Sequence, residues 1–179
     1  MTEPAAITDS LLVARTPDTA LVRVEGRGTF RQGGPLKQFL AASLGEGCRE
    51  VVVDCGPCQG MDSTFMGVIA GAACRLQATR DGRIALVNLS ERSLRNITTL
   101  GLTRVVDAHL AGDTPDRIAA LLDRAGAEAI APRDETEHEL TRTMLRAHED
   151  LVTLDDSNRE RFRDVLAYLR EDARRQEGS

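Results

Sequence analysis

The stretch that decides the fold is VVVDCGPCQGMDSTFMG, residues 51–67. The continuous valine run at residues 51–53 predicts a buried strand, because apolar runs of this length suit a sheet covered on at least one face. Asp62, Ser63 and Thr64 are all residue types that cap helix N-termini, and apolar periodicity begins directly behind them. The stretch therefore predicts a strand, a Gly/Pro loop and a helix over about 63–79.

This arrangement places a small hydroxyl at the start of a helix. Unpaired N–H groups and the helix dipole favour negative charge there, so the position suits a phosphate. An ordinary helix cap has the same pattern, so these residues alone leave both interpretations open. Behind the cap, Gly67, Ala70 and Gly71 form a face of small side chains. That face suits either tight packing against the sheet or docking of a partner.

Further strands and helices are predicted on both sides of this stretch. Strand-like segments lie at 11–15, 20–24, 83–88 and near 104–107, and helical segments at 35–44, 90–100 and 115–125. Residues 25–34, EGRGTFRQGG, are interpreted as a flexible connection, with Pro35 at the first position of the next helix. The glycine spacing there does not match a dinucleotide-binding loop. Strands that alternate with helices indicate an α/β domain whose sheet is covered by helices.

Beyond residues 131–133 the sequence is helical throughout. Two segments, about 134–152 and 157–174, carry apolar side chains at helical spacing and predict a helical hairpin. The apolar stripes of these helices must be buried against another surface. That surface is either the α/β domain of the same chain or a second copy in a homodimer. We therefore expect these domains: a flexible tail at 1–8, an α/β domain at 9–132, a hairpin extension at 133–175 and a tail at 176–179.

The box MDSTFMGVI, with a hydrophobic strand before it and a long helix after it, resembles the signature of the STAS domain (sulphate transporter and anti-sigma factor antagonist). The similarity continues through GRIALVN at 82–88, SERSLRN at 90–96, Leu-Gly-Leu at 100–102 and Val-Val-Asp at 105–107. It covers about residues 9–126. The resemblance implies an α/β STAS fold: a central mixed sheet of about five strands, a β-hairpin followed by alternating βα units, covered by about four helices. The C-terminal hairpin is an addition to that fold.

In bacterial anti-sigma factor antagonists of this family, the regulatory serine directly follows the aspartate of the box. The resemblance therefore implies Ser63 as phosphoacceptor, with Thr64 as runner-up and Asp62 as switch and cap. It also implies a protein that binds an anti-sigma factor kinase while unphosphorylated and is reset by a PP2C-type phosphatase. Met61, Phe65 and Met66 are the candidate partner contacts.

Phe65 and Met66 stand where these antagonists usually have Gly-Leu, which resembles the stressosome branch. A stressosome-like scaffold and a STAS accessory subunit of a lipid or ABC transporter therefore remain as alternatives.

Other chemistry receives less support from the sequence. Cys55-Gly-Pro-Cys58 reproduces the tetrapeptide of thioredoxin-type oxidoreductases, but the predicted helix begins well after Cys55, so thiol redox chemistry is a distant alternative. The four cysteines lack the paired spacing of a zinc site. His109, His138 and His148 have no partner at catalytic spacing and are expected at the surface. We expect no enzymatic activity, no metal and no cofactor.

Composition narrows the classes of protein further. The 179 residues are 41% apolar and 28% charged, which is typical of a globular protein, and the net charge of −5 argues against a nucleic-acid binder. No apolar run approaches the ~18 residues of a membrane span. The first ten residues have neither the positive nor the apolar region of a signal peptide. These features predict a cytoplasmic protein, and the STAS resemblance implies a bacterial one.

Overall fold

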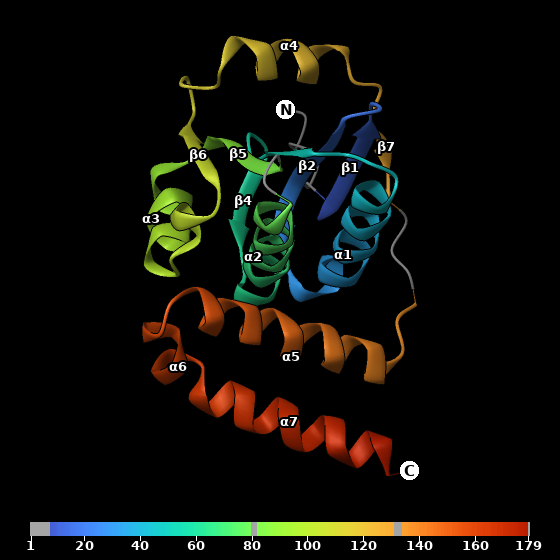
Figure 1. The fold of residues 1–179 in the computed structure, drawn as a ribbon, viewed down its shortest axis with the longest axis vertical. Coiled ribbons are helices and arrows are strands. Elements are labelled where there is room, and N and C mark those ends of the chain that lie inside the picture. Colours follow the sequence, from blue (N-terminus) through green and yellow to red (C-terminus); the bar gives the residue numbers. More distant parts are fainter. Residues whose placement is uncertain (1–7, 80–81, 131–133, 179) are drawn as a thin grey trace, which may run out of the picture.

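The computed structural model describes residues 8–79, 82–130 and 134–178 (Figure 1). These residues form one seven-stranded sheet in the order β6-β5-β3-β2-β1-β7, with β4 also paired to β2. The strands are β1 (Ser10–Arg15), β2 (Thr19–Gly28), β3 (Glu50–Asp54), β4 (Cys58–Met61), β5 (Arg83–Leu89), β6 (Asp107–Leu110) and β7 (Glu128–Ala129). The β1–β2 hairpin and the β1–β7 pair are antiparallel, and the remaining pairs are parallel, so the sheet is mixed.

Strand β3 is buried on both faces of the sheet, which explains its continuous valine run. Val51 and Val53 belong to the main core beneath α1 (Phe30–Gly45) and α2 (Ser63–Ala78). Val52 points to the opposite face, where it packs with Ile118 of α4 (Asp116–Arg124). Helices therefore cover both faces. Helix α3 (Glu91–Thr99) and the short 3-10 helix η1 (Leu102–Arg104) precede the edge strand β6 (Figure 1). The α/β fold expected from the sequence, a mixed sheet covered by helices, is confirmed.

The C-terminal segment forms the expected hairpin and lies on its own α/β domain. It comprises α5 (Glu137–Leu154), the short α6 (Ser157–Arg161) and α7 (Arg163–Glu177). Helix α5 packs on α2 and α1, and α7 packs on the outer side of α5 (Figure 1). Four hairpin side chains join the main core of the domain: Ala147, Leu151, Phe162 and Leu166. The hairpin thus buries its apolar stripe within the same chain.

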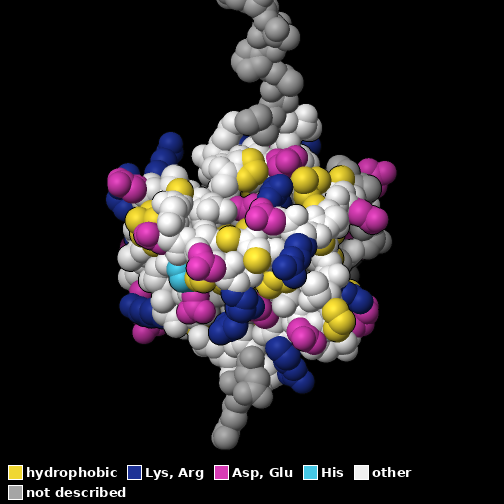
Figure 2. Space-filling model, turned by 90° about the horizontal axis from the view of Figure 1, so that it is seen from above, with side chains coloured by type: hydrophobic (Ala, Val, Ile, Leu, Met, Phe, Trp, Pro, Cys, Tyr) yellow, Lys and Arg dark blue, Asp and Glu magenta, His cyan; other side chains and the backbone are white. Residues whose placement is uncertain are grey.

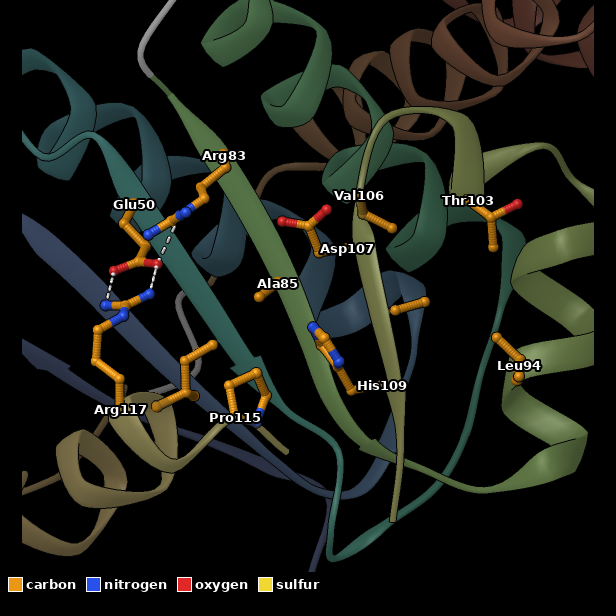
Figure 3. Close-up of a pocket in the computed structure, with 12 residues that line it drawn as sticks. Glu50, Arg83, Ala85, Leu94, Thr103, Val106, Asp107, His109, Pro115 and Arg117 are labelled. Atoms are coloured by element: carbon orange, nitrogen blue, oxygen red, sulfur yellow. Dashed lines mark hydrogen bonds and ion pairs between the residues drawn. The ribbon is translucent and has the colours of Figure 1, made fainter. Parts of the chain in front are cut away.

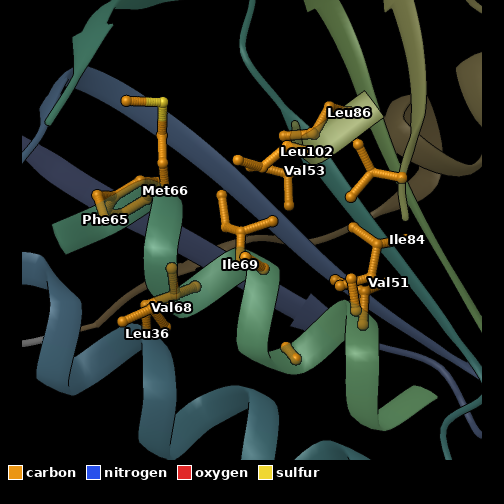
Figure 4. Packing of buried hydrophobic residues seen from close by; sticks show 14 of the residues in the cluster. Leu36, Val51, Val53, Phe65, Met66, Val68, Ile69, Ile84, Leu86 and Leu102 are labelled. Carbon is orange, nitrogen blue, oxygen red and sulfur yellow. The ribbon is translucent and has the colours of Figure 1, made fainter. Parts of the chain in front are cut away.

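The main core is almost entirely aliphatic. Figure 4 shows Ile69 of α2 between Leu36 of α1 and the sheet valines, with Phe65 and Met66 one turn earlier on the same helix. Each such side chain, fully buried, contributes about 1.5–3 kcal/mol by leaving water. Because α2 makes the middle of this core, the start of α2 is fixed in place relative to the sheet.

The segment at 25–34 differs from the expectation of a flexible connection. Strand β2 continues to Gly28, and α1 already begins at Phe30. The helix starts early because Gln32 Oε1 accepts hydrogen bonds from the backbone N–H and the hydroxyl of Thr29, at 2.9 and 2.6 Å. Pro35 therefore lies inside α1 and not at its first position, so that expectation was wrong.

The last parallel strand is also displaced from its expected position near 104–107. Val105 and Val106 belong to the turn after η1. The Val106 side chain is part of the core, and the Val105 side chain packs against it, so β6 starts only at Asp107. Their apolar character reflects burial in a turn. The short strands β4 and β7, two to four residues each, add to the five expected.

Candidate functional site at the start of helix α2

The start of α2 is organised by one carboxylate. Asp62 is the N-cap of α2, and its Oδ1 accepts a hydrogen bond from the backbone N–H of Phe65 at 2.9 Å. Its Oδ2 accepts a second one from the backbone N–H of Phe30, at the start of α1, at 2.7 Å. A negative charge is favourable at both helix N-termini. Asp62 therefore fixes the beginnings of two helices at one point.

Ser63, the first residue of α2, is bonded to the C-terminal hairpin. Its Oγ lies 2.9 Å from Nε2 of His148 on α5. The other ring nitrogen, Nδ1, lies 2.7 Å from the backbone oxygen of Met144. A carbonyl oxygen only accepts, so Nδ1 carries a proton and donates to Met144, while Nε2 pairs with the Ser63 hydroxyl. The expected phosphoacceptor is thus hydrogen-bonded to the hairpin.

His148 is a core residue, which corrects the expectation of a surface histidine. Only 3% of it is exposed, and its ring meets the Phe162 ring edge-on, with centroids 4.9 Å apart and an interplanar angle of 74°. The sequence did contain a signal for this burial. His148 follows Met144 by four residues and precedes Leu151 by three, so it shares the buried stripe of its helix.

The other residues of the box are less accessible than Ser63. Thr64, Phe65 and Met66 are all buried, whereas Met61 and Ser63 are half-buried. Phe65 is packed so tightly that a Cβ on Gly28 would contact its ring at 2.8 Å. Of the three candidate partner contacts, only Met61 is partly exposed in this conformation.

The face of small residues on α2 is covered by the hairpin. A Cβ on Gly67 would overlap the backbone carbonyl of Ala147, and one on Gly71 would overlap the carboxylate of Asp150. Ala70 belongs to the core of the domain. The two glycines therefore permit close approach of α5 to α2, which is neither packing against the sheet nor an open docking face.

The Cys55/Cys58 pair lies apart from any helix start. Both are free thiols; Cys55 is buried, and Cys58 is the first residue of β4. Burial raises the pKa of the Cys55 thiol well above its usual range and, less strongly, that of Cys58. Because the thiolate is the reactive form, these environments disfavour nucleophilic or redox chemistry.

Of the cavities beside the described sheet, two are relevant to chemistry, and neither is lined by Ser63 or His148. One, of about 340 Å³, adjoins the start of α2 and is lined mainly by polar residues, among them Arg27, Asp62 and Arg92. The other, of about 660 Å³, lies toward α4; there Glu50 accepts hydrogen bonds from Arg83 and Arg117 (Figure 3). A serine bonded to a histidine has the geometry of a nucleophile and its base, but catalysis also needs space for substrate. Here the ring is packed between α2 and Phe162.

The described part of the chain offers no metal site, since no three His, Cys, Asp or Glu side chains in it are grouped to hold an ion. Among the same residues, no helix has the length and apolar character needed to cross a membrane. On the face that carries α4, basic and acidic side chains are interspersed, with hydrophobic groups between them (Figure 2).

Comparison with known proteins identifies the fold. A family model described as "Mlab, STAS domain" matches residues 11–107, more than half of the chain. A putative anti-sigma factor antagonist from Thermotoga maritima, TM1081, is similar in structure, with a TM-score of 0.52 and 18% identity over 63% of this chain and 93% of its own. The Bacillus cell fate determinant SpoIIAA in its phosphorylated form gives a TM-score of 0.50 and 17% identity over 64% and 100%. No curated protein sequence matches the chain.

Proposed function

The chain belongs to the STAS-domain family, and we propose that it is an anti-sigma factor antagonist switched by phosphorylation of Ser63. In this role the unphosphorylated protein binds an anti-sigma factor kinase and so releases a sigma factor. The kinase phosphorylates Ser63, and a PP2C-type phosphatase restores the binding form. The protein itself acts as a binding module in the bacterial cytoplasm, without an enzymatic activity of its own.

One observation carries this proposal: Ser63 is the first helical residue directly after the capping carboxylate of Asp62. A phosphate on that hydroxyl would lie at the positive end of the helix dipole, where negative charge is favourable. The cap itself does not use the Ser63 hydroxyl, so phosphorylation leaves the Asp62 hydrogen bonds intact. The helix start of the α/β domain can therefore accept the modification.

The same phosphate would change how the surface is recognised. It adds about −1.5 to −2 charges and three acceptor oxygens beside Asp62. An apolar or acidic partner surface that fits the neutral serine would then face a concentrated negative charge. The likeness in fold to SpoIIAA in its phosphorylated form supports this interpretation.

Its position at the helix start favours Ser63 over Thr64 as the phosphoacceptor. Thr64 is buried beside Gly33 of α1, whereas Ser63 is half-buried at the helix start. Among the candidate partner contacts Met61, Phe65 and Met66, only Met61 has a partly exposed side chain. A homodimer through the hairpin would have to use the outer side of α7, where Val165 and Tyr168 are exposed by 39% and 67%.

Affinity capture tests the proposal directly. Tagged wild-type protein and the variants Ser63→Ala and Ser63→Asp are used as bait in a lysate of the source bacterium, and bound proteins are identified by mass spectrometry. We expect a GHKL-type serine kinase with the wild type and with Ser63→Ala, and much less of it with Ser63→Asp. Recovery of stressosome paralogues would assign a scaffold role instead, and recovery of an ABC transporter subunit would assign an accessory role.

A further inference from the structure

The hairpin covers the face of α2 that the proposed function requires. A kinase and an anti-sigma partner must both reach Ser63 and the first turns of α2. In the structure, α5 lies across these turns, with Ser63 bonded to His148 and Gly67 against Ala147. The surface that would bind a partner is thus already occupied by a helix of the same chain.

We propose that the C-terminal hairpin, residues 137–177, is an autoinhibitory cover that must leave α2 before Ser63 is phosphorylated or the partner binds. This inference rests on the proposed function and concerns the regulation of the same site. The hairpin and the partner compete for one surface. The closed form is the resting state, and partner or kinase binding shifts the population to the open form.

The hydrogen bond of Ser63 explains why the closed form is a poor phosphoacceptor. In the transfer, the Ser63 oxygen forms a bond to the γ-phosphorus of ATP, ADP leaves, and the hydroxyl proton passes to a base of the kinase. The attacking oxygen and the leaving oxygen must lie roughly in line with the phosphorus. In the closed form the Ser63 hydroxyl is hydrogen-bonded to His148, and Phe162 packs against that ring. The kinase base cannot reach the proton while α5 remains in place.

The contact between the two helices leaves no room for a second chain. At Gly67 the α5 backbone lies where a Cβ would be, so even a methyl group cannot enter. At Gly71 the space is filled by the Asp150 side chain, which can move. A partner that binds the first turns of α2 must therefore displace α5, and cannot bind on top of it.

The hairpin holds together by its own polar contacts. Between α5 and α7, Thr141 donates to Asp172 at 2.9 Å, and Arg170 donates to Glu149 at 3.2 Å. Within α7, Gln176 donates to the same carboxylate of Asp172 at 3.0 Å. These bonds need no residue of the α/β domain. The hairpin can therefore move as a unit.

Its interface with the α/β domain contains buried polar groups. Asn158 donates to the backbone oxygen of Leu100 at 2.9 Å, but its own side-chain oxygen is buried without a partner. His148 is a second polar side chain at this interface. Such groups recover hydrogen bonds to water when the surfaces separate, so they lower the cost of opening relative to an apolar interface. The interface also buries Ala147, Leu151, Phe162 and Leu166, so the closed form is favoured, and the polar groups reduce the cost of opening it.

Three glycine-to-alanine variants of the full-length chain isolate the α2–α5 contact. Gly67→Ala places a methyl group against the α5 backbone, and Gly71→Ala places one against the end of a side chain. Gly45→Ala, in α1, is the matched control because its Cβ would meet nothing within 4 Å. Hydrogen exchange is followed in α5, α7, β3 and β5. Phosphorylation is measured by mass spectrometry after incubation with ATP and a lysate of the source bacterium.

We expect Gly67→Ala to raise amide exchange in α5 and α7 by about tenfold or more, while β3 and β5 stay protected. Phosphate on Ser63 should form faster by a similar factor. Gly71→Ala should give a smaller rise, and Gly45→Ala should match the wild type. Unchanged hairpin exchange in Gly67→Ala would overturn the proposal, because the contact would not hold the cover.

Two further outcomes separate this inference from the proposed function. If the hairpin opens in Gly67→Ala but Ser63 is phosphorylated as fast in the wild type, the cover is not inhibitory and the proposed function stands. If Ser63 stays unmodified in every protein although the hairpin is open, the proposed function fails and the inference with it.

Should Gly67→Ala also lose protection in β3 and β5, Arg104→Gln provides the test. This exposed arginine is bonded to Asp155 at 2.8 Å, and faster hairpin exchange without faster phosphorylation would again overturn the proposal.

Discussion

Ser63, the first residue of α2, and His148, in α5, are 85 residues apart in the chain and are joined by a hydrogen bond of 2.9 Å. This bond connects the expected phosphoacceptor of the STAS domain to an extension outside the family match at residues 11–107. The backbone oxygen of Met144 accepts a hydrogen bond from Nδ1, which leaves Nε2 facing the Ser63 hydroxyl. The extension therefore contributes directly to the site.

Replacing His148 with alanine should destabilise the protein. The substitution removes a buried ring, its contact with Phe162 and the partner of the Ser63 hydroxyl. We expect the free energy of unfolding to fall by roughly 2–4 kcal/mol, as for other large-to-small changes in a core. Urea unfolding provides the measurement, with His109→Ala, at a half-buried position, as the control that should cost below about 1 kcal/mol. Equal effects of the two variants would contradict the buried position of His148.

Removing the carboxylate of Asp62 should loosen two helices at once. Asp62→Ala deletes hydrogen bonds to the backbone of Phe65 and Phe30, and each cap is worth about 0.5–2 kcal/mol. Asp62→Asn keeps one acceptor oxygen and should lose roughly half as much stability. Hydrogen exchange should show faster exchange in the first turns of both α1 and α2 in the alanine variant. A change confined to α2 would argue against the shared cap.

Stability should depend on pH through Glu50. Hydrogen bonds from Arg117, and more weakly from Arg83, lower the pKa of the Glu50 carboxyl despite its burial. Because the folded-state pKa lies below the unfolded one, about 4.3, this stabilisation is complete above that value and is lost as pH falls through the folded pKa. Glu50→Gln should cost about 1–2 kcal/mol at neutral pH, a modest value because both arginines are half exposed.

Urea unfolding tests this dependence. The free energy of unfolding of the wild type and of Glu50→Gln is measured at neutral pH, where the carboxyl is ionised, and at about pH 3. The difference between the proteins should shrink at the acidic pH, where the wild-type carboxyl is protonated more readily in the unfolded state. The same difference at both pH values would contradict the role assigned to the ionised carboxylate.

A chain that ends at residue 133 should be much less stable than the full-length protein. It lacks the side chains that the hairpin adds to the main core, including Leu151, Phe162 and Leu166. At about 1.5–3 kcal/mol for each buried side chain, the loss is several kcal/mol out of a typical total of 5–15 kcal/mol. The midpoint of thermal unfolding should fall, whereas removal of Gly178 and Ser179 should leave it unchanged. An unaltered midpoint in the short chain would show that the hairpin is dispensable for stability.

The elements that carry their own local pattern could be predicted from the sequence. The valines of β3 and the apolar periodicity of α2 indicated a strand and a helix because burial on fixed faces determines both. The two long helices of the hairpin were predicted from their apolar periodicity, and the capping residue before α2 from its residue type.

The remaining features depend on contacts that no local pattern contains. Strand β4, with the sequence CQGM, has little strand propensity of its own and exists because it pairs with the second half of β2. Gly33 and Gly34 suggested a loop, but they lie within α1. The bond between Ser63 and His148 joins distant segments, so only the packing of α5 on α2 reveals it.

Mapping the phosphate on the protein tests the central claim most directly. The full-length protein is isolated from its source bacterium in the presence of phosphatase inhibitors, and the peptide that contains both Ser63 and Thr64 is sequenced by tandem mass spectrometry. We predict phosphate on Ser63, with Thr64 unmodified because it is buried. Phosphate on Thr64 alone, or an unmodified peptide in cells where the captured kinase is active, would contradict the account.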